Sequence, residues 1–246
     1  LEAGGGALAF AAEMIASGLS PGVLEYLDAK TMRCVGEYCC FGGLARRSDC
    51  LFVEFDGDRG RVASEARALE SMARRAAVAV RSARDPAERE LLWKLRRSVS
   101  PSLARRGVTK VNEDISLPLG RLAEGTAAAH DLAGEHGLDC YIFGHAGDGN
   151  MHVNIMTDRR RQEEMKRVRR FVERLFERVV SLGGALSGEH GIGLTKSPYL
   201  GMIFTPAEIA IARGIKRAMD PREILNPGKY FMADGAAAAA GPSGKA

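Results

Sequence analysis

The stretch from Tyr141 to Asn154 constrains the fold of this chain most strongly, because an apolar run enters a glycine-rich turn and leaves it again as a second apolar run. Asp-Gly dipeptides favour two-residue hairpin turns. With Asp148-Gly149 at the centre of such a turn, His145 would lie directly opposite His152. Opposed side chains have Cβ atoms roughly 4.5–5.5 Å apart, so the sequence predicts an antiparallel hairpin whose two imidazoles could bind one divalent ion. Histidines that only form hydrogen bonds are the alternative.

A second polar stretch follows some forty residues later, Ser-Gly-Glu-His-Gly-Ile-Gly at positions 187–193. Two imidazoles and a carboxylate are ligands that suit Zn²⁺, Mn²⁺ or Fe²⁺. We therefore predict a metal site formed by His145, His152 and Glu189. Because neighbours on extended backbone point to opposite sides, His190 is expected to face away from the ion and to be free for another task.

Helical and strand-like segments alternate along the chain. Amphipathic or Ala-rich patterns predict helices near 7–17, 57–75, 85–99, 118–137, 159–182 and 206–219. Strands are expected at 50–56, 77–81, 108–117 and through the hairpin at 138–156. The order strand, helix, strand, strand, helix, strand between 111 and 186 is the split βαβ pattern of a ferredoxin-like fold. We expect an α+β domain with a ferredoxin-like antiparallel sheet and helices packed on one face.

Composition narrows the classes of function. The net charge of +4 is spread over predicted helices, which argues against nucleic-acid binding. No apolar run approaches the roughly 18 residues of a membrane span, so membrane contact would be peripheral or through a partner. Five cysteines without Cys-x-x-Cys spacing favour reduced thiols and a cytoplasmic location. A metal cluster built from Cys34, Cys39, Cys40 and Cys50 is a weaker alternative.

Three motifs together, at 144–152, 188–193 and 225–229, resemble the C-terminal domain of FAD-linked 2-hydroxy-acid oxidoreductases. That family of vanillyl-alcohol-oxidase-like flavoproteins includes the glycolate oxidase flavin subunit, D-lactate dehydrogenases and D-2-hydroxyglutarate dehydrogenases. The resemblance implies a substrate and metal domain over residues 1–232 and a flexible tail at 233–246. The FAD-binding domain that precedes this region in the family is expected to be absent from this chain.

The resemblance also implies roles for individual residues. His145, His152 and Glu189 would ligate a divalent metal that holds the substrate, and His190 would be the catalytic base. The implied substrate-binding residues are Arg96, Lys110, Asn154 and Ser100. The implied cofactor-binding residues, which would line one side of the flavin, are Gly191, Gly193, Asn226 and Lys229.

The implied reaction is oxidation of a small D-2-hydroxy acid to the 2-oxo acid, with hydride transfer to FAD. The expected partners are an FAD-binding domain, in the same chain or a separate one, an electron-transfer subunit and a second copy in a homodimer. Without the FAD-binding domain the chain is expected to be inactive. Two alternatives stay open: a non-catalytic assembly module, and a stand-alone metallohydrolase, although the chain lacks a His-Glu-x-x-His helix.

Overall fold

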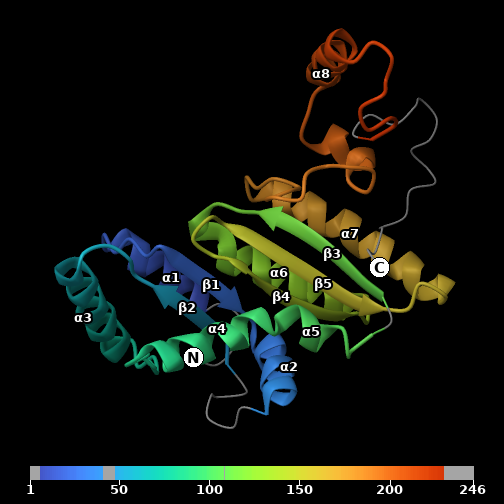
Figure 1. Cartoon of the computed structure of the whole chain (residues 1–246). Helices are drawn as coiled ribbons and strands as arrows, with labels where there is room; N and C mark the ends of the chain where they lie inside the picture. The colour runs from blue at the N-terminus through green and yellow to red at the C-terminus, as the bar shows by residue number, and fades with distance from the viewer. Residues whose placement is uncertain (1–5, 41–47, 108, 230–246) are drawn as a thin grey trace.

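A five-stranded antiparallel sheet forms the centre of the computed structural model, which describes residues 6–40, 48–107 and 109–229 (Figure 1). The strands lie in the order β2-β1-β4-β5-β3. Their bounds are Val23–Leu27 (β1), Cys50–Glu54 (β2), Thr109–Ser116 (β3), Asp139–His145 (β4) and Asn150–Thr157 (β5). The α+β architecture with an antiparallel sheet is therefore confirmed.

Three helices cover one face of the sheet: α1 (Gly6–Ala16), α6 (Leu122–Glu135) and α7 (Gln162–Ser181). The apolar stripe of α7, which includes Val168, Phe171 and Phe176, is fully buried against the main core. A short 3₁₀ turn, η1 (Leu119–Arg121), leads into α6. This layer is the one that the helical periodicity of the sequence predicts.

Helices also pack on the opposite face: α2 (Ala29–Cys39), α4 (Pro86–Arg97) and α5 (Val99–Leu103). They bury a second, smaller core with Leu27, Tyr141 and Phe143. Side chains of Asp28 and Asp85 accept hydrogen bonds from the first turns of α2 and α4, which fixes where these helices begin. This second layer covers only part of its face, and the uncovered part carries the polar residues described below.

The unit β3-α6-β4-β5-α7 has the predicted ferredoxin-like order. The expected final strand is reduced to one antiparallel bridge between Ser116 and Ala185, at the outer side of β3. The strand predicted at 77–81 is wrong. Helix α3 ends at Arg75 (Arg59–Arg75), and Ala77, just beyond it, is in the left-handed conformation with φ of 53°. The following residues line an apolar cavity of about 570 Å³ beside β2 instead of pairing with it. That cavity is lined by none of the predicted site residues.

The hairpin register also differs from the prediction. His152 lies opposite Phe143, and His145 lies opposite Asn150, so the turn spans four residues, 146–149. Gly149 has φ of +75°, and a Cβ there would lie 2.2 Å from the carbonyl oxygen of Leu117, so only glycine fits this turn. The register is shifted by two residues, and because strand side chains alternate with a period of two, both histidines still lie on the same face.

The C-terminal part projects from the body of the domain (Figure 1). It contains η2 (Ser197–Met202) and α8 (Pro206–Met219), and no residue of α8 is buried. Large apolar side chains are exposed there, among them Ile211 (65%) and Met219 (80%). In the part of the chain that the structure describes, no helix is both long and apolar enough to cross a bilayer. The tail expected at 233–246 lies outside the described residues.

Candidate metal and substrate site

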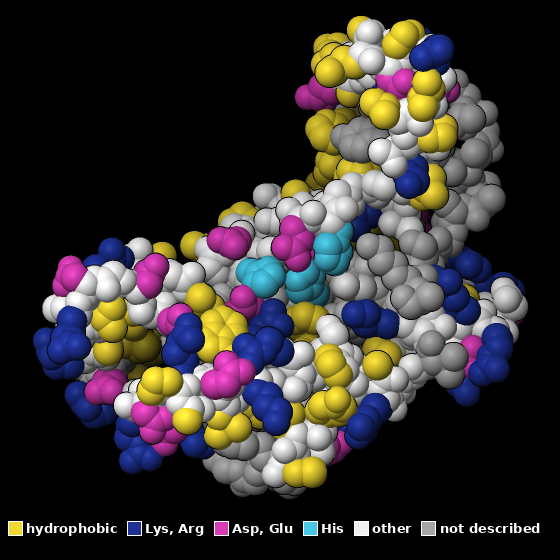
Figure 2. All heavy atoms as spheres, in the orientation of Figure 1, with side chains coloured by type: hydrophobic (Ala, Val, Ile, Leu, Met, Phe, Trp, Pro, Cys, Tyr) yellow, Lys and Arg dark blue, Asp and Glu magenta, His cyan; other side chains and the backbone are white. Residues whose placement is uncertain are grey.

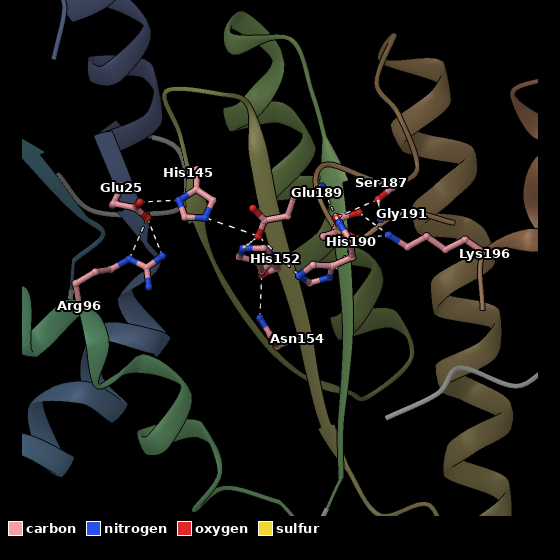
Figure 3. A network of polar contacts seen from close by, with 11 residues as sticks. Glu25, Arg96, His145, His152, Asn154, Ser187, Glu189, His190, Gly191 and Lys196 are labelled. Carbon is pink, nitrogen blue, oxygen red and sulfur yellow. Dashed lines mark hydrogen bonds and ion pairs between the residues drawn. The ribbon is translucent and has the colours of Figure 1, made fainter. Parts of the chain in front are cut away.

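His145, His152 and Glu189 converge on the part of the sheet face that α2, α4 and α5 leave uncovered (Figure 3). Figure 2 shows histidine side chains gathered beside acidic ones on this side of the molecule. The Nε2 atoms of His152 and His145 lie 3.4 Å and 3.8 Å from Glu189 Oε1. One ligand atom from each of the three residues lies within 4.8 Å of the other two. Among the described residues this is the one such group of potential metal ligands, and the five cysteines are free thiols that take no part in it.

His190 lies beside this group and not away from it. Its ring stacks on that of His152, with centroids 5.3 Å apart and planes 16° apart, and its Nε2 is 3.7 Å from Glu189 Oε1. The expectation that Glu189 and His190 point to opposite sides is wrong, because the loop bends there instead of running extended. Gly188 allows the loop to lie close to Asn150 of β5, since a Cβ at position 188 would lie 2.2 Å from Asn150 Oδ1.

Burial keeps His152 uncharged. Removal from water, followed by the neighbouring His145 and His190, lowers the pKa of His152 to about 4. The neutral imidazole is the form that binds metal ions. Its Nδ1 is buried and has no hydrogen-bond partner within the described ranges.

Glu25, on β1, is a site residue that the sequence analysis missed. It pairs with His145 across the sheet, and its Oε1 lies 2.6 Å from His145 Nδ1. This contact favours a proton on Nδ1, which leaves the Nε2 lone pair facing Glu189. A glutamate in the middle of the apolar run Val-Leu-Glu-Tyr-Leu was the available signal.

Arg96, predicted to bind substrate, makes a different contact in this structure. Its Nε and Nη2 donate to Glu25 Oε2 at 2.9 Å and 2.7 Å, and its guanidinium lies over the Phe143 ring. Both charged side chains are mostly buried, at 15% and 11% exposure. Arg96 therefore lies next to His145 but is already paired with a carboxylate.

The other predicted substrate-binding residues lie at different distances from the cluster. Asn154 is fully buried next to it, and its amide donates to the carbonyls of His152 and Tyr141. Lys110 lies on the same face of β3, and burial lowers the pKa of its ammonium group. Ser100 is exposed on α5, and no described polar contact joins its side chain to the histidines.

The predicted cofactor-binding residues fall into two groups. Gly191 and Gly193 are exposed in the loop that also carries Glu189, and both have positive φ. Asn226 and Lys229 form a turn in the projecting C-terminal part, where Lys229 Nζ donates to Asn226 Oδ1 at 3.2 Å. No described hydrogen bond links the two groups.

Besides Glu25, the sequence analysis missed two further residues of this site, Asp114 on β3 and Lys196. Asp114 lies opposite His152 in the register and is fully buried. The sequence analysis gave Asp114 no role, since a carboxylate in a strand does not by itself indicate which loop it will meet.

Residues 5–230 match the family model described as FAD linked oxidases, C-terminal domain. The chain belongs to this family. It is 36% identical over 223 residues to the glycolate oxidase subunit GlcD of Bacillus subtilis, covering 90% of this chain and 47% of that protein. It is 32% identical to a probable mitochondrial D-lactate dehydrogenase of Danio rerio, covering 74% of this chain and 37% of that protein.

A D-2-hydroxyglutarate dehydrogenase of Stutzerimonas stutzeri is 38% identical over 146 residues, which is 58% of this chain and 31% of that protein. This FAD-linked oxidase domain thus spans half or less of the length of these relatives. Among solved structures, p-cresol methylhydroxylase with bound substrate superposes with a TM-score of 0.66 at 13% identity, over 92% of this chain and 49% of that one. The predicted fold family is therefore confirmed.

Proposed function

We propose that this domain is the substrate- and metal-binding half of an FAD-dependent enzyme that oxidises a D-2-hydroxy acid to the 2-oxo acid. The observation that carries the proposal is the convergence of His145, His152 and Glu189 on an open face, beside a further imidazole. Relatives named glycolate oxidase subunit, D-lactate dehydrogenase and D-2-hydroxyglutarate dehydrogenase support this substrate class.

The donor set fits a divalent transition metal. Two imidazole nitrogens and one carboxylate oxygen leave coordination positions open toward solvent, and Glu189 is half exposed. The buried His152 is already neutral, so no proton has to leave it near neutral pH. When bound, such an ion would supply Lewis-acid polarisation of the substrate hydroxyl and carboxylate oxygens. Zn²⁺, Mn²⁺ and Fe²⁺ all suit these ligands.

His190 is the residue that we assign as the base. Its Nδ1 lies 3.4 Å from the Asp114 carboxylate, which favours a proton on Nδ1. Nε2 then carries the lone pair and faces the same space as Glu189 and His152, where it can accept the hydroxyl proton of a substrate. The FAD of the whole enzyme would accept the hydride.

The substrate carboxylate would need a cation in addition to the metal. Lys110 lies on the metal-bearing face, and Arg96 lies against Glu25 beside His145. Arg96 could bind the substrate carboxylate only if it gave up one of its two hydrogen bonds to Glu25. Lys110 would contribute a point charge. Gly191 and Gly193, which carry no side chain, leave the loop beside His190 open to the flat face of a flavin.

Metal content of the purified chain tests the proposal. After dialysis against Zn²⁺ or Mn²⁺, we expect about one ion per chain for the wild type and a large loss in the His145→Ala, His152→Ala double variant. The matched control is His130→Ala, His136→Ala, which removes two imidazoles that lie outside the cluster. Equal metal content in the wild type and the first double variant would contradict the proposal.

A further inference from the structure

Asp114 connects the sheet to the loop that carries Glu189 and His190. Its Oδ2 accepts hydrogen bonds from the backbone N–H of Glu189 at 2.7 Å, the backbone N–H of His190 at 2.8 Å and the hydroxyl of Ser187 at 3.1 Å. Two successive backbone amides that converge on one carboxylate oxygen form an anion nest, and that arrangement fixes the backbone of both residues.

Lys196 neutralises the other carboxylate oxygen of Asp114. Lys196 Nζ forms an ion pair with Oδ1 and also donates to the Asp114 carbonyl oxygen at 2.8 Å. Lys196 is 4% exposed and Asp114 is 0% exposed, so water does not screen the pair. Burial alone would raise the pKa of Asp114, but the His190 amide, Lys196 and the Glu189 amide together lower it below its usual range.

Ser187 adds to this anchor, the set of hydrogen bonds that Asp114 Oδ2 accepts from the loop. Its Oγ donates to Asp114 Oδ2 and accepts a hydrogen bond from the backbone N–H of Gly191 at 2.8 Å. Within the loop from 187 to 191, the Ser187 side chain binds the Gly191 amide, and the Asp114 carboxylate joins the loop to β3. Asp114 on β3 lies directly opposite His152 on β5. The residue that holds the loop and the strand that carries His152 therefore belong to one pair of hydrogen-bonded strands.

From these contacts we infer that Asp114, neutralised by Lys196, is a positioning residue that sets the distance of the Glu189 carboxylate and the His190 ring from His152. This inference rests on the proposed function, since it assigns the anchored loop a role in holding a metal ion and a base. Partners that orient metal ligands without touching the metal typically change its affinity by about 10–100-fold when they are removed. A purely structural ion pair would change stability but leave the affinity of the folded protein unchanged.

Asp114→Asn keeps the shape of the side chain and removes its charge. We expect its affinity for Zn²⁺, measured by calorimetry at a temperature where circular dichroism shows a folded protein, to fall by about 10–100-fold. The matched controls are the two neighbours on β3, Glu113→Gln and Ile115→Ala, whose side chains point to the opposite face. Both should bind Zn²⁺ as the wild type does, although Ile115→Ala is less stable.

Ser187→Ala is a milder second variant in case Asp114→Asn does not fold. It removes one of the three hydrogen bonds to Oδ2 and frees the Gly191 amide, so Zn²⁺ affinity should fall by about 3- to 10-fold. Unchanged affinity in the folded Asp114→Asn protein would overturn the inference. If that protein does not fold, unchanged affinity in Ser187→Ala would do so.

Amide hydrogen exchange separates failure of this inference from failure of the proposed function. In the wild type without metal, the amides of Glu189 and His190 should be protected, and in Asp114→Asn both should exchange at least about tenfold faster while those of β4 and β5 are unchanged. A wild-type chain that binds no divalent ion would contradict the proposed function, and with it the role assigned to the anchor. Equal exchange of both amides in the wild type and Asp114→Asn would overturn the anchoring itself.

Discussion

The carboxylate of Glu25 contacts two side chains of the candidate site at once. Oε1 binds His145 and Oε2 binds Arg96, so one residue of β1 orients a proposed metal ligand and neutralises a proposed substrate-binding cation. Glu25 and His145 are 120 positions apart in the sequence. Residue types alone therefore indicated the proposed ligands, whereas the partners that orient them depend on which strands become neighbours.

Glu113 gives a pH-dependent prediction at the same scale. Burial, partly offset by Lys196, raises the pKa of this carboxyl from 4.5 to about 7. The folded protein holds the proton more tightly than the unfolded chain, so the free energy of unfolding should fall as pH rises from about 4.5 to 7 and stay low above that.

Glu113→Gln should remove this dependence. We expect the variant to match the wild type near pH 5 and to be more stable by about 1–3 kcal/mol at pH 8, as measured by urea denaturation. The same difference in stability between the two proteins at pH 5 and pH 8 would show that Glu113 does not titrate in this window.

At the scale of elements, the sequence predicted the hairpin and the long helix α7 correctly because their periodicities are strong. It failed in the hairpin register, since Asp148-Gly149 suggested a two-residue turn. In the four-residue turn that forms instead, Gly149 packs against the Leu117 carbonyl, a contact between distant segments. The histidines remained together only because the shift was an even number of residues.

The candidate site, like the hairpin, was predictable only in part. Glu189, His145 and His152 are chemically distinctive and lie close together as expected, although what they bind stays a prediction. The orientation of His190 was not predictable, because the backbone amides of Glu189 and His190 donate to Asp114, which lies on a strand distant in the sequence. A pattern of residue types does not report such backbone contacts.

Helix α8 should be the least protected long helix of this domain. None of its residues is buried, whereas α7 buries seven side chains. Helices without tertiary packing open at low free energy. In hydrogen-exchange mass spectrometry, peptides from α8 should exchange much faster than peptides from the centre of α7. Equal protection of both helices in the isolated domain would contradict the packing described here.

At the scale of the whole molecule, the domain presents an open polar face beside a projecting C-terminal part with exposed apolar side chains. The predicted flavin-contacting residues Gly191, Gly193, Asn226 and Lys229 would line only one side of a flavin. We therefore expect this chain to purify without bound FAD, as judged by its visible absorption spectrum. A yellow protein with one flavin per chain would show that these residues are sufficient to bind the cofactor.

Flavin reduction in the complete enzyme, with this domain and an FAD-binding half together, tests the central claim most directly. Under anaerobic conditions a D-2-hydroxy acid such as D-lactate should reduce the flavin. The His190→Ala variant should keep its metal but reduce the flavin about 10²–10⁴-fold more slowly, the usual contribution of a general base, whereas Glu189→Ala should lose the metal. The account is contradicted if no D-2-hydroxy acid reduces the flavin of the wild type, or if His190→Ala loses the metal and reduces flavin normally once the metal is restored.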